Sequence, residues 1–266
     1  MCKTCLTDFK HSVKSLKGER AVGSNFWKPG QEITISFLSG TSQQKDFVKR
    51  VASKWQSVTG LTFKWVDSGM IRIDFQNDGS WSYIGTENLS IPVNEPTMNF
   101  GWIDEDIQMN DESTVLHEFG HMVGLEHEHQ NPSGGIKWNK SAVIKDLSGP
   151  PNNWDLATIQ HNVFDLSDST NYTKFDPDSI MLYPFPSSWT LDGMGTKANK
   201  TISKTDSSFM AEIYHSNPSP SLKQVFTSAT DIRPLSLSTL RRWATFLKLD
   251  PSGTRNKLAD KIFNAL

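Results

Sequence analysis

The sequence predicts an α+β fold, in which a mixed sheet and a few helices form one large domain and a small all-helical appendage follows it. Two observations support this fold class. Short segments with alternating apolar and polar residues, typical of strands, are interspersed with segments of helical periodicity. A linker-like stretch, SNPSPS (216–221), precedes a C-terminal tail that has only helical periodicity. At 266 residues, the chain is long enough for a large core and an appendage.

The domain opens with a predicted strand, helix and two strands. EITISFL (32–38), LTFKWVD (61–67) and MIRIDF (70–75) each alternate as strands do. Between the first two, residues 45–59 carry apolar residues at helical spacing and form an amphipathic helix. This order of elements predicts a sheet with mixed pairing.

The next elements lead to a histidine-rich helix. Residues 79–86 and 97–103 are predicted as short strands separated by a proline-containing loop. Asp111, Glu112 and Ser113 then supply the acidic, cap-forming residues with which a helix begins.

The second half is richer in turn formers. Helices are predicted at 155–164 and 203–215, with a short apolar turn segment at 178–188 between them. In the tail, residues 237–266 predict two short helices around a Pro-Ser-Gly turn.

Composition excludes several classes of protein. Hydrophobic residues make up 36% and charged residues 21%, as in globular rather than disordered chains. The net charge of −2 gives no overall attraction to nucleic acid or anionic membranes. No run of about 18 apolar residues occurs, so no membrane-spanning helix is expected.

The N-terminal twenty residues lack the apolar core of a secretory signal. Three locations are therefore consistent with this segment. The protein is cytoplasmic, it is exported by a non-classical route, or it is exported by a signal that the given sequence lacks. Cys2 and Cys5 are the only cysteines, so the rest of the chain has no disulfide. They are interpreted as free thiols, with a redox or partial metal site as the alternative.

Four of the seven histidines lie within thirteen residues of the segment TVLHEFGHMVGLEHEHQNP (114–132). His117 and His121 are four apart, so they project from one face of a helix, and Glu118 lies beside the first. Gly124 can adopt the left-handed conformation that ends the helix, which lets His127 approach from another direction. Three imidazoles and one open position are typical of catalytic zinc. The alternatives are a solvated helix with incidental histidines and a non-catalytic metal store.

Two motifs resemble those of one family. HEFGHMVGLEH resembles the long zinc signature of the metzincin metallopeptidases, and HEHQNP resembles the astacin branch and its bacterial relatives. SIMLY (179–183) is similar to the Met-turn of that family. The resemblance covers residues 21–215. It implies a sheet-containing N-terminal subdomain, an active-site helix below a cleft, and a smaller, irregular C-terminal subdomain.

The resemblance also implies roles for individual residues. It makes Glu118 the general base, Met181 the hydrophobic floor below the metal, and Tyr183 a swinging ligand or an oxyanion stabiliser. Tyr183 as an ordinary buried tyrosine is the alternative. His129 is expected behind the ligands or at the surface. The implied zinc ligands are His117, His121 and His127.

In astacins the glutamate after the third histidine, here Glu128, binds the N-terminus that processing frees. Arg20-Ala21 is a candidate cleavage point, so residues 1–20 are either a pro-segment, in which Cys2 or Cys5 caps the zinc, or an unprocessed leader. Astacin domains usually contain disulfides, and their absence here favours the bacterial type.

Residues 235–266 resemble a SAP-like helical module. From Leu237 to Leu266 there are six Lys or Arg and two Asp. The module is therefore expected either to bind nucleic acid or to dock on protein.

Together these observations predict a monomeric zinc endopeptidase that cleaves proteins bound in extended conformation, with the edge strand SYIGT (82–86) as the candidate pairing site. The domains are a leader or pro-segment (1–20), a catalytic domain (21–215), a linker (216–234) and the helical module (235–266). The alternative function is a DNA- or partner-tethered protein in which the C-terminal module dominates and proteolysis is secondary.

Overall fold

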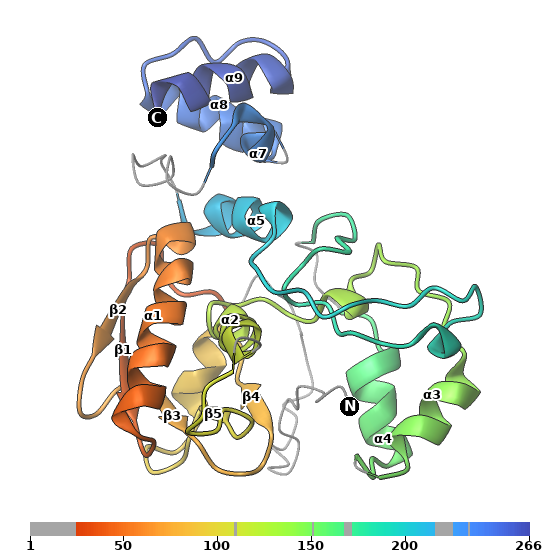
Figure 1. Cartoon of the computed structure of the whole chain (residues 1–266). Coiled ribbons are helices and arrows are strands. Elements are labelled where there is room, and N and C mark those ends of the chain that lie inside the picture. The colour runs from red at the N-terminus through yellow and green to blue at the C-terminus, as the bar shows by residue number, and fades with distance from the viewer. Residues whose placement is uncertain (1–24, 109–110, 151, 168–171, 216–225, 234) are drawn as a thin grey trace.

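A computed structural model describes residues 25–108, 111–150, 152–167, 172–215, 226–233 and 235–266. The predicted leader, residues 1–20 with Cys2 and Cys5, lies outside the described residues. Figure 1 shows the sheet and its helices as one body, an irregular subdomain beside it, and the C-terminal helices against α5. The strands are β1 (Glu32–Phe37), β2 (Thr62–Trp65), β3 (Ile71–Asp74), β4 (Ser80–Ser82) and β5 (Met98–Phe100). The α-helices are α1 (Ser42–Thr59), α2 (Asp111–Met122), α3 (Lys140–Leu147), α4 (Leu156–Ile159), α5 (Lys204–Tyr214), α7 (Ala229–Ile232), α8 (Leu237–Phe246) and α9 (Arg255–Ala265).

The five strands form one mixed sheet in the order β2-β1-β3-β5-β4. The first three pairings along this order are parallel, and β4 pairs antiparallel with β5 at the edge. The predicted α+β class and mixed pairing are confirmed.

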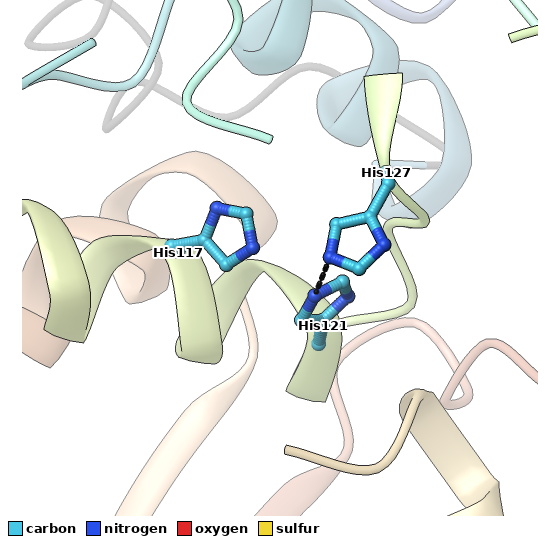
Figure 2. Close-up of side chains that lie close together, drawn as sticks. All are labelled: His117, His121 and His127. Carbon is cyan, nitrogen blue, oxygen red and sulfur yellow. Dashed lines mark hydrogen bonds between the residues drawn. The ribbon is translucent and has the colours of Figure 1, made fainter. Parts of the chain in front are cut away.

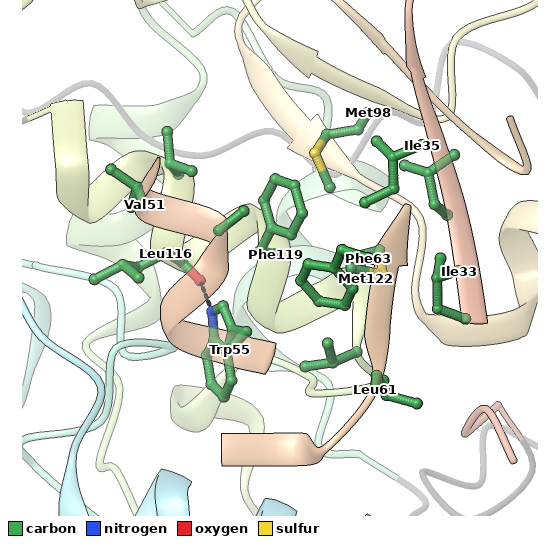
Figure 3. Packing of buried hydrophobic residues seen from close by; sticks show 14 of the residues in the cluster. Ile33, Ile35, Val51, Trp55, Leu61, Phe63, Met98, Leu116, Phe119 and Met122 are labelled. Atoms are coloured by element: carbon green, nitrogen blue, oxygen red, sulfur yellow. Dashed lines mark hydrogen bonds between the residues drawn. The ribbon is translucent and has the colours of Figure 1, made fainter. Parts of the chain in front are cut away.

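The helices α1 and α2 lie side by side against the sheet (Figure 1). Helix α1 begins with a capping box between Thr41 and Gln44 and ends at Gly60, which has φ +67°. The buried Trp55 of α1 donates from Nε1 to the carbonyl of Leu116 on α2, at 2.8 Å (Figure 3). This bond and the surrounding apolar cluster fix the position of α2 relative to the sheet.

The predicted strand at 79–86 is shorter in the structure. β4 covers only residues 80–82, and a 3-10 helix, Gly85–Ser90, follows. The reason is the chain segment before β1, where the carbonyl of Asn25 accepts from Thr86 N at 2.7 Å. Gly85 has φ +48°, and a Cβ there would collide with the Asn25 carbonyl. The chain therefore turns away after Tyr83, and Glu87 N bonds to the carbonyl of Ile84 at 3.0 Å at the start of the 3-10 helix.

The C-terminal subdomain is built on a small separate core. Its buried members are Val143, Leu147, Ile159 and Val163. The predicted helix at 155–164 is split into the single turn α4 and a π-helix, Gln160–Phe164. Helix α3 was not predicted. It has an Asn139 cap, but its apolar stripe is short and the surrounding region is rich in turn formers, so its helical pattern is weak.

The two predicted C-terminal helices are present as α8 and α9. Phe226 and the short helix α7 pack with them, although both fall within the segment predicted as a linker. Residues 216–225 of that segment lie outside the described residues. Among the helices that the structure describes, none is long and apolar enough to cross a membrane.

Candidate metal centre

The helix α2 carries the first two histidines of the cluster. It begins with Asp111 and Glu112, whose negative charges suit a helix N-terminus, and from Val115 onward it is entirely buried. The helix ends as predicted from the glycine: Gly124 has φ +107°, and Leu125 N bonds back to the carbonyl of Gly120 at 2.9 Å. The chain reverses there and brings His127 back beside the two histidines of α2 (Figure 2).

The three predicted ligand residues meet at one point. His117, His121 and His127 each offer a nitrogen, and these atoms lie within 4.8 Å of one another. The Nε2 atoms of His121 and His127 are 3.1 Å apart (Figure 2). All three side chains are buried.

Backbone carbonyls fix how the imidazoles are oriented. His117 Nδ1 donates to the carbonyl of Ile180 at 2.9 Å, and His121 Nδ1 donates to that of Leu125 at 2.8 Å. Each ring therefore presents Nε2 as a lone pair, and Nε2 of His117 is buried with no hydrogen-bond partner among the described residues. Such an arrangement is typical of zinc ligands, whose second nitrogen is held by a carbonyl or carboxylate.

Burial also keeps these imidazoles neutral. It lowers the pKa of His117 to about 4 and that of His121 to about 3, with the neighbouring histidine contributing to the latter. Burial lowers the pKa of His127 well below its usual range. A neutral imidazole is the form that binds zinc, so the donor set fits this metal.

Glu118 lies one residue beyond His117 on α2, and its side chain is fully buried. Glu118 is therefore a buried carboxylate on the same helix as two of the three histidines.

Met181 lies directly below α2. It is 1% exposed, and a Cβ added to Gly120 would collide with its sulfur atom. Gly120 precedes the ligand residue His121. Because Gly120 has no side chain, the Met-turn can approach the turn of α2 that carries this ligand. The Met181 carbonyl also accepts from Glu128 N at 3.0 Å, which ties the segment after His127 to the Met-turn.

Tyr183 packs against the third histidine. Its ring centroid is 4.2 Å from that of His127 and 6.0 Å from that of His117. It also stacks on the neighbouring ring of His129, at 4.6 Å. His129 is buried behind the ligands, which is one of the two locations predicted for it. Its Nε2 donates to the carbonyl of Asn162 at 2.7 Å.

Glu128 faces a cavity next to the site. Its Oε1 accepts from Asn131 Nδ2 at 2.9 Å and from Asp176 N at 2.8 Å. Burial raises the pKa of Glu128 to about 7. Asp206 and Phe209 of α5 also line this cavity.

Sequence reasoning missed Asp206. Its buried carboxylate accepts from Ser179 Oγ at 2.8 Å and Ile180 N at 2.9 Å, so it holds the Met-turn from the first turn of α5. The signal was present as the capping-box pattern that Ser203 forms with Asp206, but a cap pattern does not say which loop the carboxylate also binds.

Of the remaining three histidines, two lie away from the cluster and one falls outside the described residues. His161 is half-buried near Asp165, and His215 donates from Nε2 to the carbonyl of Val58 at 3.0 Å. His11 lies outside the described residues.

Comparison with known proteins agrees with this geometry. The family model for the astacin peptidases matches residues 20–215. The chain is similar to a solved structure of myroilysin, with 39% identity and a TM-score of 0.71, over 73% of this chain and 98% of that one. A second myroilysin crystal structure matches with 36% identity and a TM-score of 0.60, over 80% and 91%.

A more distant match shows the fold alone. High choriolytic enzyme 1, a hatching enzyme zinc-protease from the medaka fish Oryzias latipes, has 17% identity and a TM-score of 0.52, over 74% of this chain and 98% of that one. No curated protein sequence matches the chain. These matches do not show the SAP-like resemblance of the C-terminal module, and the matched family domain ends at His215.

The family match spans most of the chain, and the three histidines meet where its zinc signature requires them. The chain therefore belongs to the astacin family of zinc metallopeptidases and is a zinc metalloendopeptidase.

Proposed function

We propose that Glu118 is the general base and proton carrier of peptide hydrolysis at a zinc ion held by His117, His121 and His127. The observation that supports this most strongly is the fully buried Glu118 carboxylate one residue from a ligand in a cluster whose nitrogens lie within 4.8 Å. Zinc in such a site supplies a Lewis acid and lowers the pKa of its bound water toward about 7.

Glu118 is proposed to carry out the proton transfers of the reaction. Glu118 accepts a proton from the attacking water and passes it to the nitrogen of the leaving amine. Burial favours this role, because a carboxylate shielded from solvent exchanges its proton with the reactants rather than with bulk water.

Tyr183 is proposed to donate from its hydroxyl to the oxyanion of the tetrahedral intermediate. The proposal is supported by the ring of Tyr183, which lies against His127 of the three-histidine cluster. A single donor of this kind typically contributes about 10²–10³-fold in turnover. Met181 is proposed as the floor of the site, since it packs under Gly120 of α2.

The substrate is proposed to lie extended along β4. This strand is at one end of the sheet order and packs against α2, so a peptide added to it would run past the metal ligands. Of the segment SYIGT, only Ser82 lies in the strand, so the proposed pairing site is β4 itself, Ser80–Ser82.

Glu128 is proposed to bind a freed N-terminus. Phe26 packs edge-on against Phe209, which lines the cavity that contains Glu128. A terminus at Ala21 is five residues from Phe26, and an extended segment of that length spans about 17 Å. An ammonium group there would compensate a carboxylate whose pKa is raised by burial.

The experiment compares Glu118→Gln with Glu112→Gln, a control on the partly exposed first turn of the same helix, where Glu112 pairs with Lys54. Glu118→Gln should bind one zinc ion per chain and lose about 10²–10⁴-fold in turnover on a peptide substrate. Glu112→Gln should retain both properties. Turnover above a tenth of wild type in zinc-loaded Glu118→Gln would refute the assignment of the base.

A further inference from the structure

The C-terminal residues beyond the astacin domain form a core that is shared with that domain. Phe226 and the buried apolar residues of α7, α8 and α9 cluster around Ala211, which belongs to α5 and is fully buried. In Figure 1, α5 lies between the catalytic body and the C-terminal helices. We call residues 226–233 and 235–266 the C-terminal cap.

Polar contacts join the C-terminal cap to α5 along the length of this helix. The Glu212 carboxylate accepts from Thr239 Oγ1 at 2.9 Å and from Ser236 N at 3.3 Å, at the start of α8. Ser208 Oγ donates to the carbonyl of Asp231 at 2.7 Å.

The contacts extend to both ends of α5. Lys204, in its first turn, forms an ion pair with Asp231 at 2.6 Å. Trp243 Nε1 donates at 3.3 Å to the carbonyl of His215, the residue that follows α5. The buried Trp243 therefore holds one end of the helix, and the ion pair, whose Lys204 side chain is 71% exposed, adds a weaker contact at the other.

The other side of α5 holds the Met-turn. Asp206 receives hydrogen bonds from Ser179 Oγ and Ile180 N, and also from Ser203 N at 3.0 Å. The buried carboxylate thus accepts three hydrogen bonds. Residues 179–183 lie in no helix or strand, so these bonds help to fix the position of Ser179 and Ile180.

Ile180 in turn orients the first zinc ligand through its carbonyl. Its N–H is bound by Asp206, and its carbonyl accepts from His117 Nδ1 at 2.9 Å. Residue Ile180 therefore connects Asp206 to the imidazole of His117. Partners that orient metal-binding histidines typically contribute about 10–100-fold in metal affinity.

We propose that the C-terminal cap is an intramolecular brace for the zinc site, which acts through α5 and Asp206 on Ile180 and so on His117. Asp206 is a positioning residue in this arrangement. An isolated helix of eleven residues such as α5 is only marginally stable, so its geometry depends on what packs on both of its sides. Met210 and Tyr214 bury one side in the main core, and the cap buries Ala211 on the other.

The test measures how fast full-length, zinc-loaded protein loses zinc to a chelating dye in excess. Glu212→Gln weakens the contact between the cap and α5 without touching the site, and Asp206→Asn breaks the next link. The matched control is Asp250→Asn, which removes a hydrogen-bonded carboxylate of the cap that binds Ser252 and Lys261 rather than α5.

Asp206→Asn should accelerate zinc loss about tenfold, since it acts one link behind the orienting carbonyl. Glu212→Gln should accelerate it by about threefold, and Asp250→Asn should not change it. The double variant Asp206→Asn/Glu212→Gln should lose zinc at the rate of Asp206→Asn alone, because both lie on one route.

Several outcomes would overturn the proposal: unchanged zinc loss in Glu212→Gln or Asp206→Asn, equal acceleration by Glu212→Gln and Asp250→Asn, or independent effects in the double variant. Far-UV circular dichroism and thermal unfolding of the metal-free variants establish that each is folded. If Asp206→Asn does not fold, Ser179→Ala replaces it, since this change removes one hydrogen bond to Asp206 and predicts a smaller acceleration in the same direction.

Discussion

Replacing Gly124 by alanine tests the reversal that delivers the third ligand. Gly124 has φ +107°, which L-residues rarely adopt, and a Cβ there would lie 2.5 Å from the ring of Phe26. The backbone strain costs about 1–3 kcal/mol, and the collision costs about 1–3 kcal/mol more. The variant should therefore be destabilised by about 2–6 kcal/mol, a large part of the stability of a typical domain.

The control for this substitution is Gly30→Ala. Gly30 has φ +74° but nothing within 4 Å of an added Cβ, so it reports the backbone cost alone, about 1–2 kcal/mol. The assay is thermal unfolding of the metal-free proteins, in which each kcal/mol corresponds to about 2–4 °C at this size. Zinc affinity by competition with a chelator should fall at least about tenfold in Gly124→Ala and stay unchanged in Gly30→Ala.

A second-site change separates the two costs at Gly124. Adding Phe26→Ala should make Gly124→Ala less damaging than the two single changes together predict, since the collision is then removed. Equal unfolding temperatures for Gly124→Ala and Gly30→Ala, with wild-type zinc affinity in both, would refute the reasoning.

Three further predictions follow from the same contacts. Tyr183→Phe should lower kcat by about 10²-fold with little change in KM, measured on a peptide substrate; unchanged kcat would exclude Tyr183 as an oxyanion donor. Gly120→Ala should lower the unfolding temperature despite the better helix propensity of alanine, because the collision with Met181 costs about 1–3 kcal/mol against a gain of about 1 kcal/mol; a rise would contradict the packing. Burial lowers the pKa of His215 below its usual 6.5, so the folded state binds fewer protons than the unfolded state and stability falls as the pH drops below about 6.5; His215→Gln should show a shallower loss in denaturant titrations, and an identical pH dependence would contradict this.

The sequence predicts the metal centre well because its ligands are local. His117, His121 and His127 lie within eleven residues, and helix periodicity with one glycine determines how they converge. The strands of the sheet are also predicted, because alternation in segments such as 32–38 reflects burial on one face or both.

Contacts between distant segments could not be predicted in the same way. Asp206 binds the Met-turn 26 residues away, and the carbonyl of Asn25 accepts from Thr86 N beyond the end of β4. Both depend on side chains or carbonyls whose partners are set only by the tertiary fold. The docking of residues 226–233 on α5 escaped prediction for the same reason, since their polar composition is typical of a linker.

Zinc K-edge X-ray absorption tests the coordination on which the mechanism and the brace depend. The sample is full-length protein with Cys2→Ser and Cys5→Ser, so that thiolates cannot contribute. The expected result is one zinc per chain with three imidazole nitrogens at about 2.0–2.1 Å and one further light ligand. Two or fewer imidazoles, or zinc well below one per chain, would contradict the convergence of His117, His121 and His127 on a single ion.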